Sequence, residues 1–529
     1  MRRWNGWGDE SVRLELPKPA LAYLRARAGP ASVPHDAAFD AVVQTIADSR
    51  LPARENIDVS PATRLLHARG QSLPDWFALR FGRVSRVPDG VAFPESAEEV
   101  RELLTYARDA GACVIPYGGG TSVVGHINPP PDDVAQPVLT VSLARMRRLL
   151  DLDEASRLAT FGAGVTGPDL ESQLRVRGYT LGHFPQSFEY STLGGWIVTR
   201  SSGQQSLRYG RIERLFAGGR IETPAGTLRI PTVPASAAGL DIRELILGSE
   251  GRIGIVTEAT VRVRPIPAHE SFHGWFFPAW EDAEKAVHEL AHAGTDLSML
   301  RLANASETRT TLGLAGGGAT RALLGGYLRL RGSGGERCLL LVGVTGTEPA
   351  CRASLQSARA IVEAHRGLYF GEQLGKRWEH SRFRGVYLRN ALWEHGYAVE
   401  TVETAVDWPR VRVMMHALEA AGRAAFSGER VHAYTHLSHV YPQGSSVYST
   451  FIFRIAPSYE ENLARWQTLK RALSDAIVAN GGTISHQHGV GIDHRAYLEA
   501  EKGALGIGAM RAIFRSFDPE GRMNPGKLC

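Results

Sequence analysis

"VIPYGGGTSVVG", residues 114–125, is a short apolar run that leads directly into three consecutive glycines. Glycine loses more conformational freedom on folding than any other residue, so a run of three needs a physical reason. A glycine-rich loop after a strand can turn backbone N–H groups toward phosphate oxygens, and the missing side chains permit close approach. The run matches neither GxGxxG nor the Walker pattern, which disfavours a nicotinamide Rossmann site and an NTPase. For an isolated GGG, a tight turn without a ligand would be the better explanation.

The loop lies in a region where helical and strand patterns alternate. Before it, Ser96 and Glu99 form a capping box at the start of an amphipathic helix, and Gly111 ends that helix. The residues ACVIP then predict a short strand that delivers the chain into the glycine loop. Further strands are predicted at 138–142 and 158–164. The region from about residue 76 onward therefore mixes helices and strands.

Two further segments rich in glycine and small polar residues follow the first. Residues 186–203 read QSFEYSTLGGWIVTRSSG, and residues 248–256 read GSEGRIGIV. Three such loops in one region fit a long ligand with several phosphates and rings better than they fit a mononucleotide.

The three loops resemble the flavin-binding loops of the vanillyl-alcohol-oxidase/para-cresol-methylhydroxylase (PCMH) superfamily, the type 4 FAD-binding oxidases and transferases. The matching stretches are PYGGGTS, STLGGWIVTRSSG and GSEGRIGIVTEA. Within this superfamily the chain resembles the alkyldihydroxyacetonephosphate synthase (alkylglycerone-phosphate synthase) family. This likeness begins at RWNGWGDES (3–11), continues through YGRIERLF (209–216) and reaches NGGTISHQHGVG (480–491), so it spans nearly the whole chain.

The resemblance implies FAD as the cofactor, with its pyrophosphate on the glycine loop. The cofactor-binding residues that it implies are Pro116, Tyr117, Gly118, Gly119, Gly120, Thr121, Ser122, Gln186, Ser187, Phe188, Glu189, Tyr190, Ser191, Thr192, Thr199, Arg200, Ser201, Ser202, Glu250, Gly251, Arg252, Ile253, Gly254, Ile255 and Val256. Some superfamily members attach FAD covalently through a histidine in the first loop. Here that loop offers only glycines, and His126 lies beyond it. We therefore expect non-covalent FAD.

The resemblance also implies an α+β fold, with a PCMH-type FAD-binding domain of two subdomains and an α/β cap domain that carries an antiparallel sheet. A strongly alternating run that ends in prolines closes at residue 267 and marks a boundary. We expect an N-terminal helical region at 1–75, the FAD-binding domain at 76–267 and the cap domain at 268–479. A C-terminal segment, 480–529, would return to the flavin site.

The motif SHQHGVG places His486 and His488 two residues apart, so in an extended segment both point to the same side. Two imidazoles on one side suggest a zinc site or proton transfer. Zinc needs further ligands, and no cysteine or carboxylate stands at a suitable short spacing, so we expect no metal and favour proton transfer. A structural role remains an equal alternative for one of the two. The synthase family has a histidine triplet here, and Gln487, which cannot carry a proton at neutral pH, replaces its middle member.

The run VYSTFIFRI (447–455) alternates as a strand, with Tyr448 and Val447 on opposite faces. From the residues alone, a tyrosine in a strand is usually core packing and an arginine is usually a solvated surface charge. The resemblance implies more: Tyr448 falls at the catalytic tyrosine of the family, and Arg301 and Arg389 match arginines used for activity and for the substrate phosphate. The guanidinium fork fits phosphate oxygens. The candidates for catalysis are thus Tyr448, His486, His488 and Arg301, with Arg389 for substrate binding.

The activity that the resemblance implies is a redox-neutral exchange. The acyl group of acyl-dihydroxyacetone phosphate is replaced by a long-chain alcohol through an adduct at flavin N5, a step of ether-lipid synthesis. The alternative is an FAD-dependent 2-hydroxyacid dehydrogenase or oxidase of the D-lactate or glycolate type, to which the ending FDPEGRMNPGKL is similar. Such an enzyme would use His488 as the base. A flavin-binding scaffold without activity is the third alternative.

Composition limits the partners and the location. The net charge of +5 over 529 residues is mild, which disfavours nucleic acid and fits an anionic small molecule. Four scattered cysteines and the absence of an apolar leader or a peroxisomal ending predict a cytoplasmic protein. We expect a phosphate-bearing lipid substrate, a homodimer and peripheral contact with a membrane. The Gly-, Ala- and Leu-rich stretch 312–335 is predicted as a mobile surface segment rather than a lipid-facing helix.

Overall fold

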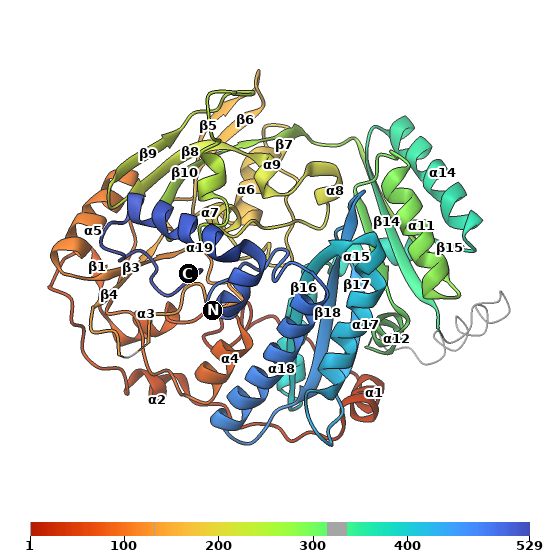
Figure 1. The fold of residues 1–529 in the computed structure, drawn as a ribbon, viewed down its shortest axis with the longest axis horizontal. Helices are drawn as coiled ribbons and strands as arrows, with labels where there is room; N and C mark the ends of the chain where they lie inside the picture. Colours follow the sequence, from red (N-terminus) through yellow and green to blue (C-terminus); the bar gives the residue numbers. More distant parts are fainter. Residues whose placement is uncertain (1, 132, 315–335) are drawn as a thin grey trace.

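The computed structural model describes residues 2–131, 133–314 and 336–529. Most of the stretch 312–335 therefore lies outside the described residues. The described chain forms two halves around separate hydrophobic cores (Figure 1). One half holds a four-stranded and a five-stranded sheet, and the other holds a single seven-stranded sheet. Helices cover both halves, and the α+β class expected from the sequence is confirmed.

The four-stranded sheet carries the glycine loop. Its order is β1(Ile57–Asp58), β2(Gly90–Ala92), β4(Val138–Ser142), β3(Cys113–Tyr117). The last three strands are parallel, and β1 is antiparallel to β2. β3 forms because its buried apolar residues follow α5(Ala97–Asp109), which begins at the predicted Ser96 cap. The loop 118–122 leaves the end of this edge strand.

The five-stranded sheet is antiparallel throughout. Its order is β5(Leu149–Asp153), β6(Leu158–Gly162), β10(Ile255–Arg262), β8(Phe216–Thr223), β9(Gly226–Ile230). α5 contacts strands of both sheets, so one apolar core joins them. The shorter elements of this half are α6(Gly167–Arg175), α7(Leu193–Val198), α8(Ser206–Tyr209), α9(Ile212–Leu215), α10(Arg243–Ile246) and the pair β7(Tyr179–Thr180) and β11(Arg264–Pro265).

The seven-stranded sheet is also antiparallel. Its order is β15(Leu368–Gly371), β12(His269–Phe277), β14(Cys338–Gly346), β13(Met299–Ala303), β17(His432–Leu437), β18(Gly444–Arg454), β16(Tyr397–Asp407). One face packs against α11(Trp280–His292), α14(Glu348–Ala364), α17(Trp408–Ala424) and α18(Tyr459–Ala479). The other face meets α12(Ala305–Leu314), α15(Gln373–Ser381), η1(Gly385–Tyr387) and α16(Leu388–Trp393) and looks toward the glycine loop.

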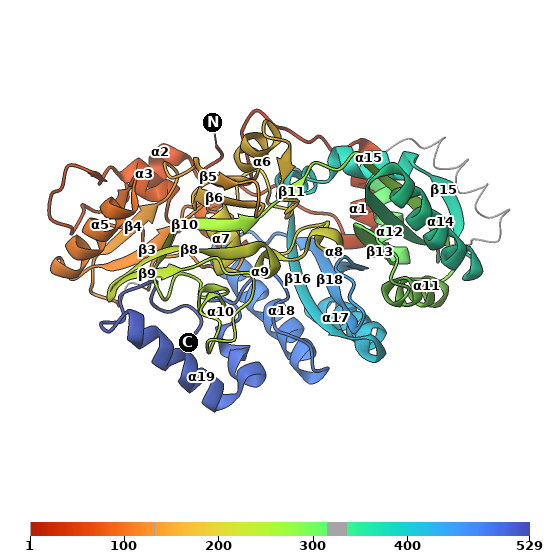
Figure 2. The same ribbon diagram turned by 90° about the horizontal axis from the view of Figure 1, so that it is seen from above.

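Both ends of the chain connect the two halves. The N-terminal elements are α1(Lys18–Ala28), α2(Phe39–Val43), α3(Pro61–Leu66) and α4(Leu73–Arg80), and Trp7, Trp76 and Phe77 enter the core under the seven-stranded sheet. After η2(Arg495–Tyr497), α19(Leu498–Phe517) packs on the core of the other half, on the same side of the molecule as α17 and α18 (Figure 2). Residues 522–524 then pair with β3 through a parallel bridge between Val114 and Met523.

Candidate active site

A cavity of about 640 Å³ lies between the two halves. One wall comes from the loops that follow β3 and precede α7 and β10, and the other comes from the inner face of the seven-stranded sheet. Of the sequence-predicted residues, those that line it are Pro116, Tyr117, Gly118, Gly119, Gly120, Thr121, Ser122, Gln186, Ser187, Ser191, Thr192, Thr199, Ser201, Ser202, Glu250, Gly251, Gly254, Ile255, Val256, Arg301, Arg389, Tyr448 and His488. The structure therefore gathers residues from all three loops and from the cap around one space.

The three glycine loops pack closely against one another. A Cβ atom at Gly119 would lie 1.7 Å from the carbonyl oxygen of Tyr190, and one at Gly118 would lie 2.3 Å from Oγ1 of Thr192. A Cβ at Gly251 would lie 2.9 Å from the ring of Pro116. The sequence pattern suggests close approach of the cofactor as the reason for the bare backbone. The structure gives a different reason at Gly118 and Gly119, because the second loop already occupies the space that a side chain there would need.

The residues at the cavity wall fit a polar, multi-ring cofactor. Five buried atoms of residues that line the cavity have no hydrogen-bond partner among the described residues: Nε1 of Trp7, Nε2 of His126, Oγ of Ser202, Oε1 of Gln204 and Oδ1 of Asn524. Buried polar atoms without partners are rare in folded proteins, so they indicate a ligand or water that completes them. FAD offers the matching hydrogen-bonding groups, and the glycine loops leave room for its phosphates.

Six predicted cofactor residues do not line the cavity. Phe188 and Ile253 are buried in apolar clusters, and the others engage the protein itself. The carboxylate of Glu189 accepts a hydrogen bond from Tyr387, the ring of Tyr190 lies against Trp7, Arg200 pairs with Glu244, and Arg252 donates to the carbonyl of Met523. These side chains hold the loops in position, and their backbone stays part of the loops.

His126 is held by the protein on both ring nitrogens. Its Nδ1 lies 2.9 Å from the hydroxyl of Ser122, and its Nε2 lies 3.0 Å from a carboxylate oxygen of Glu250. Each ring nitrogen thus has a polar neighbour within the protein, although the contact of Nε2 with Glu250 lacks hydrogen-bond geometry. This arrangement agrees with the expectation of non-covalent FAD.

Tyr448 lies on the cavity face of β18, between two imidazoles. The alternation of β18 buries Val447, Phe451 and Phe453 in the core and turns Tyr448 the other way, as the sequence pattern predicts. Its ring stacks on His436 with centroids 4.8 Å apart, and it meets the ring of His488 edge-on at 5.7 Å. Burial and the nearby Glu403 carboxylate raise the pKa of Tyr448 to about 12, although a hydrogen bond with Thr401 opposes them. The phenol is therefore protonated at neutral pH.

His488 also lines the cavity. Burial lowers the pKa of its imidazole below the usual value. A neutral imidazole can accept a proton, whereas the neighbouring phenol can donate one. The pair thus has the two functions that general acid–base chemistry requires.

Arg301 lies on β13 and contacts the side chains of Glu307 and His436, neither of which belongs to a recognised sequence motif. Its Nη2 lies 2.5 Å from Oε1 of Glu307 and 3.2 Å from Nδ1 of His436, and the same Nδ1 lies 2.9 Å from Oε2 of Glu307. Burial raises the pKa of Glu307, but Arg301 and His436 outweigh it and lower the pKa to about 2. Glu307 thus fixes the orientation of both Arg301 and His436, and through His436 the ring of Tyr448.

The low pKa of Glu307 predicts instability in acid. Because its folded pKa is lower than the usual 4.5, its ionised form stabilises the folded state above pH 4.5, and this contribution is lost as the pH falls toward about 2. We expect the midpoint of thermal unfolding to fall over this range, and to fall less in Glu307→Gln. Glu363→Gln removes an exposed carboxylate paired with Arg359 and should follow the wild type. Identical pH curves for wild type and Glu307→Gln would contradict the prediction.

Arg389 stands in a different environment from Arg301. Its Nη1 donates to the carbonyl of Gln71 at 2.7 Å, and its guanidinium lies over the ring of Trp76 at 4.4 Å. Among the described residues, no ion pair with a carboxylate involves Arg389. Burial lowers the pKa of this guanidinium, which remains a cation at neutral pH. A cation that lines the cavity and lacks an acidic partner can receive an anion.

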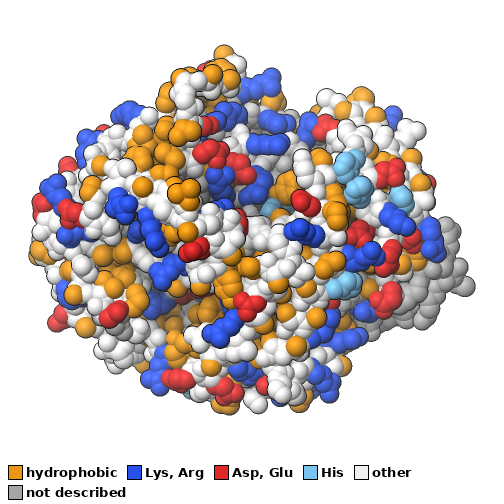
Figure 3. All heavy atoms as spheres, in the orientation of Figure 1, with side chains coloured by type: hydrophobic (Ala, Val, Ile, Leu, Met, Phe, Trp, Pro, Cys, Tyr) orange, Lys and Arg blue, Asp and Glu red, His pale blue; other side chains and the backbone are white. Residues whose placement is uncertain are grey.

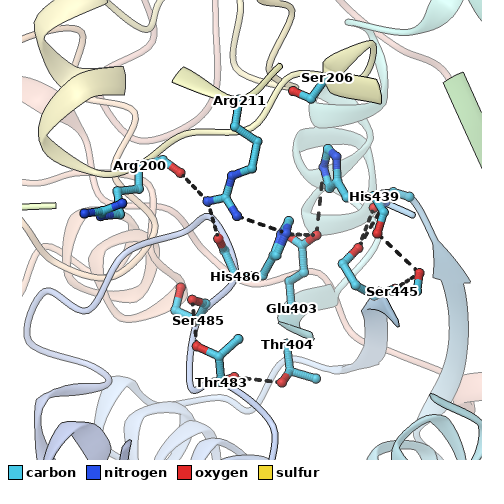
Figure 4. Close-up of polar contacts among 12 residues, drawn as sticks. Arg200, Ser206, Arg211, Glu403, Thr404, His439, Ser445, Thr483, Ser485 and His486 are labelled. Atoms are coloured by element: carbon cyan, nitrogen blue, oxygen red, sulfur yellow. Dashed lines mark hydrogen bonds and ion pairs between the residues drawn. The ribbon is translucent and has the colours of Figure 1, made fainter. Parts of the chain in front are cut away.

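His486 does not line the cavity. Figure 4 shows it between Arg211 and Glu403, near His439. Its Nδ1 lies 3.2 Å from Oε1 of Glu403, its Nε2 lies 2.8 Å from the hydroxyl of Tyr441, and its ring stacks on His439. Burial raises the pKa of Glu403, but His486, His439 and His488 outweigh it, so this pKa lies well below its usual range. Glu403 is directly opposite Tyr448 in the pairing of β16 with β18.

The structure thus adds five side chains to those expected from the sequence: Glu307, Glu403, His436, His439 and Tyr441. His436 and His439 belong to the run THLSHVYP, which a search for closely spaced histidines would find. The carboxylates leave no such signal, because they reach the site from other elements.

In the view of Figure 3, acidic and basic side chains are interspersed over the outer surface, and no large patch of a single charge is seen. Within the described ranges, we find no helix with the length and apolar character needed to cross a membrane.

Two protein-family models match the chain. One, described as an FAD binding domain, matches residues 88–230, and the other, described as FAD linked oxidases, C-terminal domain, matches residues 266–528. They cover the two halves that enclose the cavity. The expectation of FAD as the cofactor is confirmed.

Two of the proteins similar to this chain are enzymes with different names. An alkyldihydroxyacetonephosphate synthase of Dictyostelium discoideum is 30% identical over 99% of this chain and 93% of its own. A mitochondrial D-lactate dehydrogenase (cytochrome) of Arabidopsis thaliana is 28% identical over 90% of this chain and 78% of its own.

Solved structures are similar over the whole fold. An alkyldihydroxyacetonephosphate synthase structure has a TM-score of 0.85 at 27% identity and covers 100% of this chain and 99% of its own. A p-cresol methylhydroxylase structure has a TM-score of 0.69 at 13% identity, over 93% of this chain and 96% of its own, and shares the fold alone. The PCMH-type fold expected from the sequence is confirmed.

Proposed function

The chain belongs to the alkyldihydroxyacetonephosphate synthase family of FAD-dependent enzymes, and from this premise we propose that it exchanges the acyl group of an acyl-dihydroxyacetone phosphate for a long-chain alcohol. The observation that carries the proposal is the position of Tyr448. Its phenol stands between His436 and His488 on a wall that faces the three FAD loops. A protonated phenol beside a neutral imidazole supports proton transfer at a carbon next to a ketone.

The bound flavin would supply an electron sink for the substrate carbon, and the protein would supply position and proton transfer. The FAD would be held by residues 116–122, 186–192, 199–202 and 250–256. Tyr448 would move the proton between substrate and His488, because His488 is the imidazole that meets it edge-on within the cavity. Arg301, oriented by Glu307, would place positive charge on the same face of the sheet.

Arg389 would bind the substrate phosphate. Its guanidinium lines the cavity and has no acidic partner among the described residues, and Trp76 and the Gln71 carbonyl fix its plane. Arginine can bind two phosphate oxygens at once, which makes it a directional anion site.

The Arg389→Lys substitution keeps the charge but loses the fork. We expect the apparent affinity for the phosphate-bearing substrate to fall by ~1–3 kcal/mol, the range for hydrogen bonds to charged groups, while the FAD content stays unchanged. Steady-state kinetics with varied acyl-dihydroxyacetone phosphate measures this effect. Arg384→Lys, which changes an exposed arginine of the same segment, is the matched control. An unchanged apparent affinity in Arg389→Lys would remove Arg389 from the phosphate site.

The direct test of the proposed function is to incubate the pure, FAD-loaded protein with acyl-dihydroxyacetone phosphate and a labelled fatty alcohol. We expect label in an ether-linked product and release of free fatty acid, without net reduction of the flavin. Absence of labelled product under conditions where the flavin stays bound would contradict the proposal.

A 2-hydroxyacid dehydrogenase is the second candidate, because the chain is also similar to a D-lactate dehydrogenase and because His488 lines the cavity. In that reaction His488 would take the proton and the flavin would be reduced. D-lactate or glycolate would then bleach the yellow protein anaerobically. The transferase proposal expects no bleaching by either acid.

The remaining expectations from the sequence stay proposals. They are the domain limits at residues 75, 267 and 479, non-covalent attachment of FAD, a homodimer, a cytoplasmic location and peripheral contact with a membrane. The contacts of His126 with Ser122 and Glu250 support non-covalent FAD. Flavin that precipitates with the acid-denatured protein would contradict it.

A further inference from the structure

We propose that Glu403, His439 and His486 form a binding site for one divalent transition-metal ion, next to the proposed active site. One oxygen or nitrogen atom from each side chain lies within 4.8 Å of the others. The three residues come from β16, from the loop after β17 and from the C-terminal segment that carries His488 (Figure 4). They are 2%, 8% and 7% exposed, so the site is a buried one rather than a surface cluster.

The first argument is that the cluster is incomplete without a cation. Both carboxylate oxygens of Glu403 and Nδ1 of His486 are buried and have no hydrogen-bond partner among the described residues. Nδ1 of His486 and Nε2 of His439 lie 3.2 Å and 4.0 Å from the same oxygen, Oε1. A buried carboxylate without hydrogen bonds is costly, and an ion between these atoms would satisfy all of them together.

The second argument concerns the orientation of His486. Its Nε2 lies 2.8 Å from the hydroxyl of Tyr441. Metal-binding histidines usually donate their other N–H group to an oxygen, which fixes the tautomer and leaves a lone pair for the metal. Nη1 of Arg211, which can only donate, also lies 3.4 Å from Nε2, so the contacts at Nε2 are compatible with either tautomer. An ion bound at Nδ1 would select the tautomer whose Nε2–H group donates to the oxygen of Tyr441.

The positive charge nearest the cluster does not oppose an ion strongly. Nη1 of Arg211 lies 3.4 Å from Nε2 of His486, which is on the opposite side of the imidazole from Glu403. Arg211 is itself paired with Glu213 at 3.1 Å and donates to the carbonyls of Arg200 and His486. Its charge is therefore partly neutralised, and its other donors are used in fixing the loop.

The ligand set indicates the kind of ion. Two imidazoles and one carboxylate suit Zn²⁺ and its first-row neighbours rather than Mg²⁺ or Ca²⁺, which prefer oxygen ligands. Three protein ligands leave one position of a four-coordinate ion for water. Such an ion would join the C-terminal segment to the seven-stranded sheet and so hold His488 against Tyr448. The expectation of no metal followed from short spacings alone, and the carboxylate of this cluster lies on a strand far along the chain from the histidine pair.

The test measures metal binding directly. Untagged, FAD-loaded full-length protein is stripped with a chelator and dialysed against Zn²⁺, and bound zinc and flavin are both quantified. We expect one tight equivalent of Zn²⁺ in the wild type, and its loss in Glu403→Gln and in His439→Gln with the FAD content retained. We also expect Co²⁺ to give visible absorption beyond the flavin bands in the wild type alone.

Two kinds of control separate the site from other effects. Glu419→Gln and His432→Gln change a buried carboxylate and a buried imidazole elsewhere in this half, and should keep the equivalent. His288 and His292 form an exposed pair on α11 that could bind zinc adventitiously. His292→Gln breaks this pair and should also keep the tight equivalent of Zn²⁺. If Glu403→Gln loses FAD, the decision rests on His439→Gln, in which Zn²⁺ should no longer raise the unfolding temperature. No tight equivalent in the wild type, or an equivalent retained in His439→Gln, would overturn the proposal.

Discussion

The Tyr448→Phe variant is expected to lose alkyl transfer by ~10²–10⁴-fold, the usual effect of removing a general acid or base. The substitution deletes only the phenolic oxygen. The ring can still stack on His436 at 4.8 Å and the opposite face of β18 keeps its core contacts, so the fold and the FAD content should not change. The measurement is the rate of labelled ether product per bound flavin, with the flavin spectrum recorded in the same reaction.

Comparison of Tyr448→Phe with His488→Ala distinguishes the two candidate reactions. If the enzyme is a transferase, both Tyr448→Phe and His488→Ala should be severe, because the phenol and the imidazole act on the same proton. If it is a hydroxyacid dehydrogenase, His488→Ala should be severe and Tyr448→Phe mild. Tyr497→Phe changes a half-buried tyrosine whose hydroxyl donates to Asp475, and it serves as the control for the substitution itself. Full activity in Tyr448→Phe, together with bleaching by a hydroxy acid, would exclude the transferase.

The second large effect is expected at Gly119. In Gly119→Ala the new methyl group would lie 1.7 Å from the carbonyl oxygen of Tyr190 and 2.6 Å from its carbon. Both atoms are backbone, so one of the two flavin loops must move. Overpacking of this kind costs ~1–3 kcal/mol. If the loops relax when FAD is absent, this strain is present only in the FAD-bound protein. The FAD dissociation constant should then rise by about 5- to 150-fold. Gly119→Asp adds a larger, charged side chain against the same carbonyl and should abolish binding.

The control for Gly119 is a glycine that tolerates a side chain. Gly508 lies on α19 and has open space where the methyl group of an alanine would lie, so Gly508→Ala should retain FAD. The flavin-to-protein ratio after gel filtration and the fluorescence of released FAD measure the outcome. Stoichiometric FAD in Gly119→Ala would show that the loops can separate without loss of the site.

The sequence was sufficient for the parts of the site that depend on local pattern. The glycine loop after a buried strand, the cap of α5 at Ser96 and the alternation of β18 are each determined by neighbours in the chain. Alternation alone decides that Tyr448 faces away from the core that holds Val447. The likeness of the three loops to a known superfamily then supplied the cofactor, which local patterns could not identify.

The parts that could not be predicted depend on strand order and register. Glu403 reaches Tyr448 because β16 pairs with β18 in one particular register, and His436 reaches it from the other side through β17. A shift of one residue would turn each of these side chains to the opposite face. The register cannot be predicted from short-range spacing in the sequence. For this reason the two buried carboxylates, Glu307 and Glu403, could not be assigned to the site from the sequence.

The two arginines show the same limit in another form. The family resemblance marks both Arg301 and Arg389 as site residues, yet Arg301 is paired with Glu307 and Arg389 has no acidic partner among the described residues. This difference in environment is what separates an arginine that orients the site from one that can receive a phosphate.

The pairing of residues 522–524 with β3 has a consequence for how the protein is made. β3 is the edge strand that presents the glycine loop, and its backbone bonds at Val114 go to Arg522 and Asn524, near the other end of the chain. Asn524 also contributes one of the unpaired atoms at the cavity wall. At ~5–20 residues per second, a ribosome needs roughly 20–80 s to travel from Val114 to this partner. During that interval the nascent chain carries an unpaired strand edge at β3, and the wall of the cofactor site that includes Asn524 is complete only after the last residues of the chain have been synthesised.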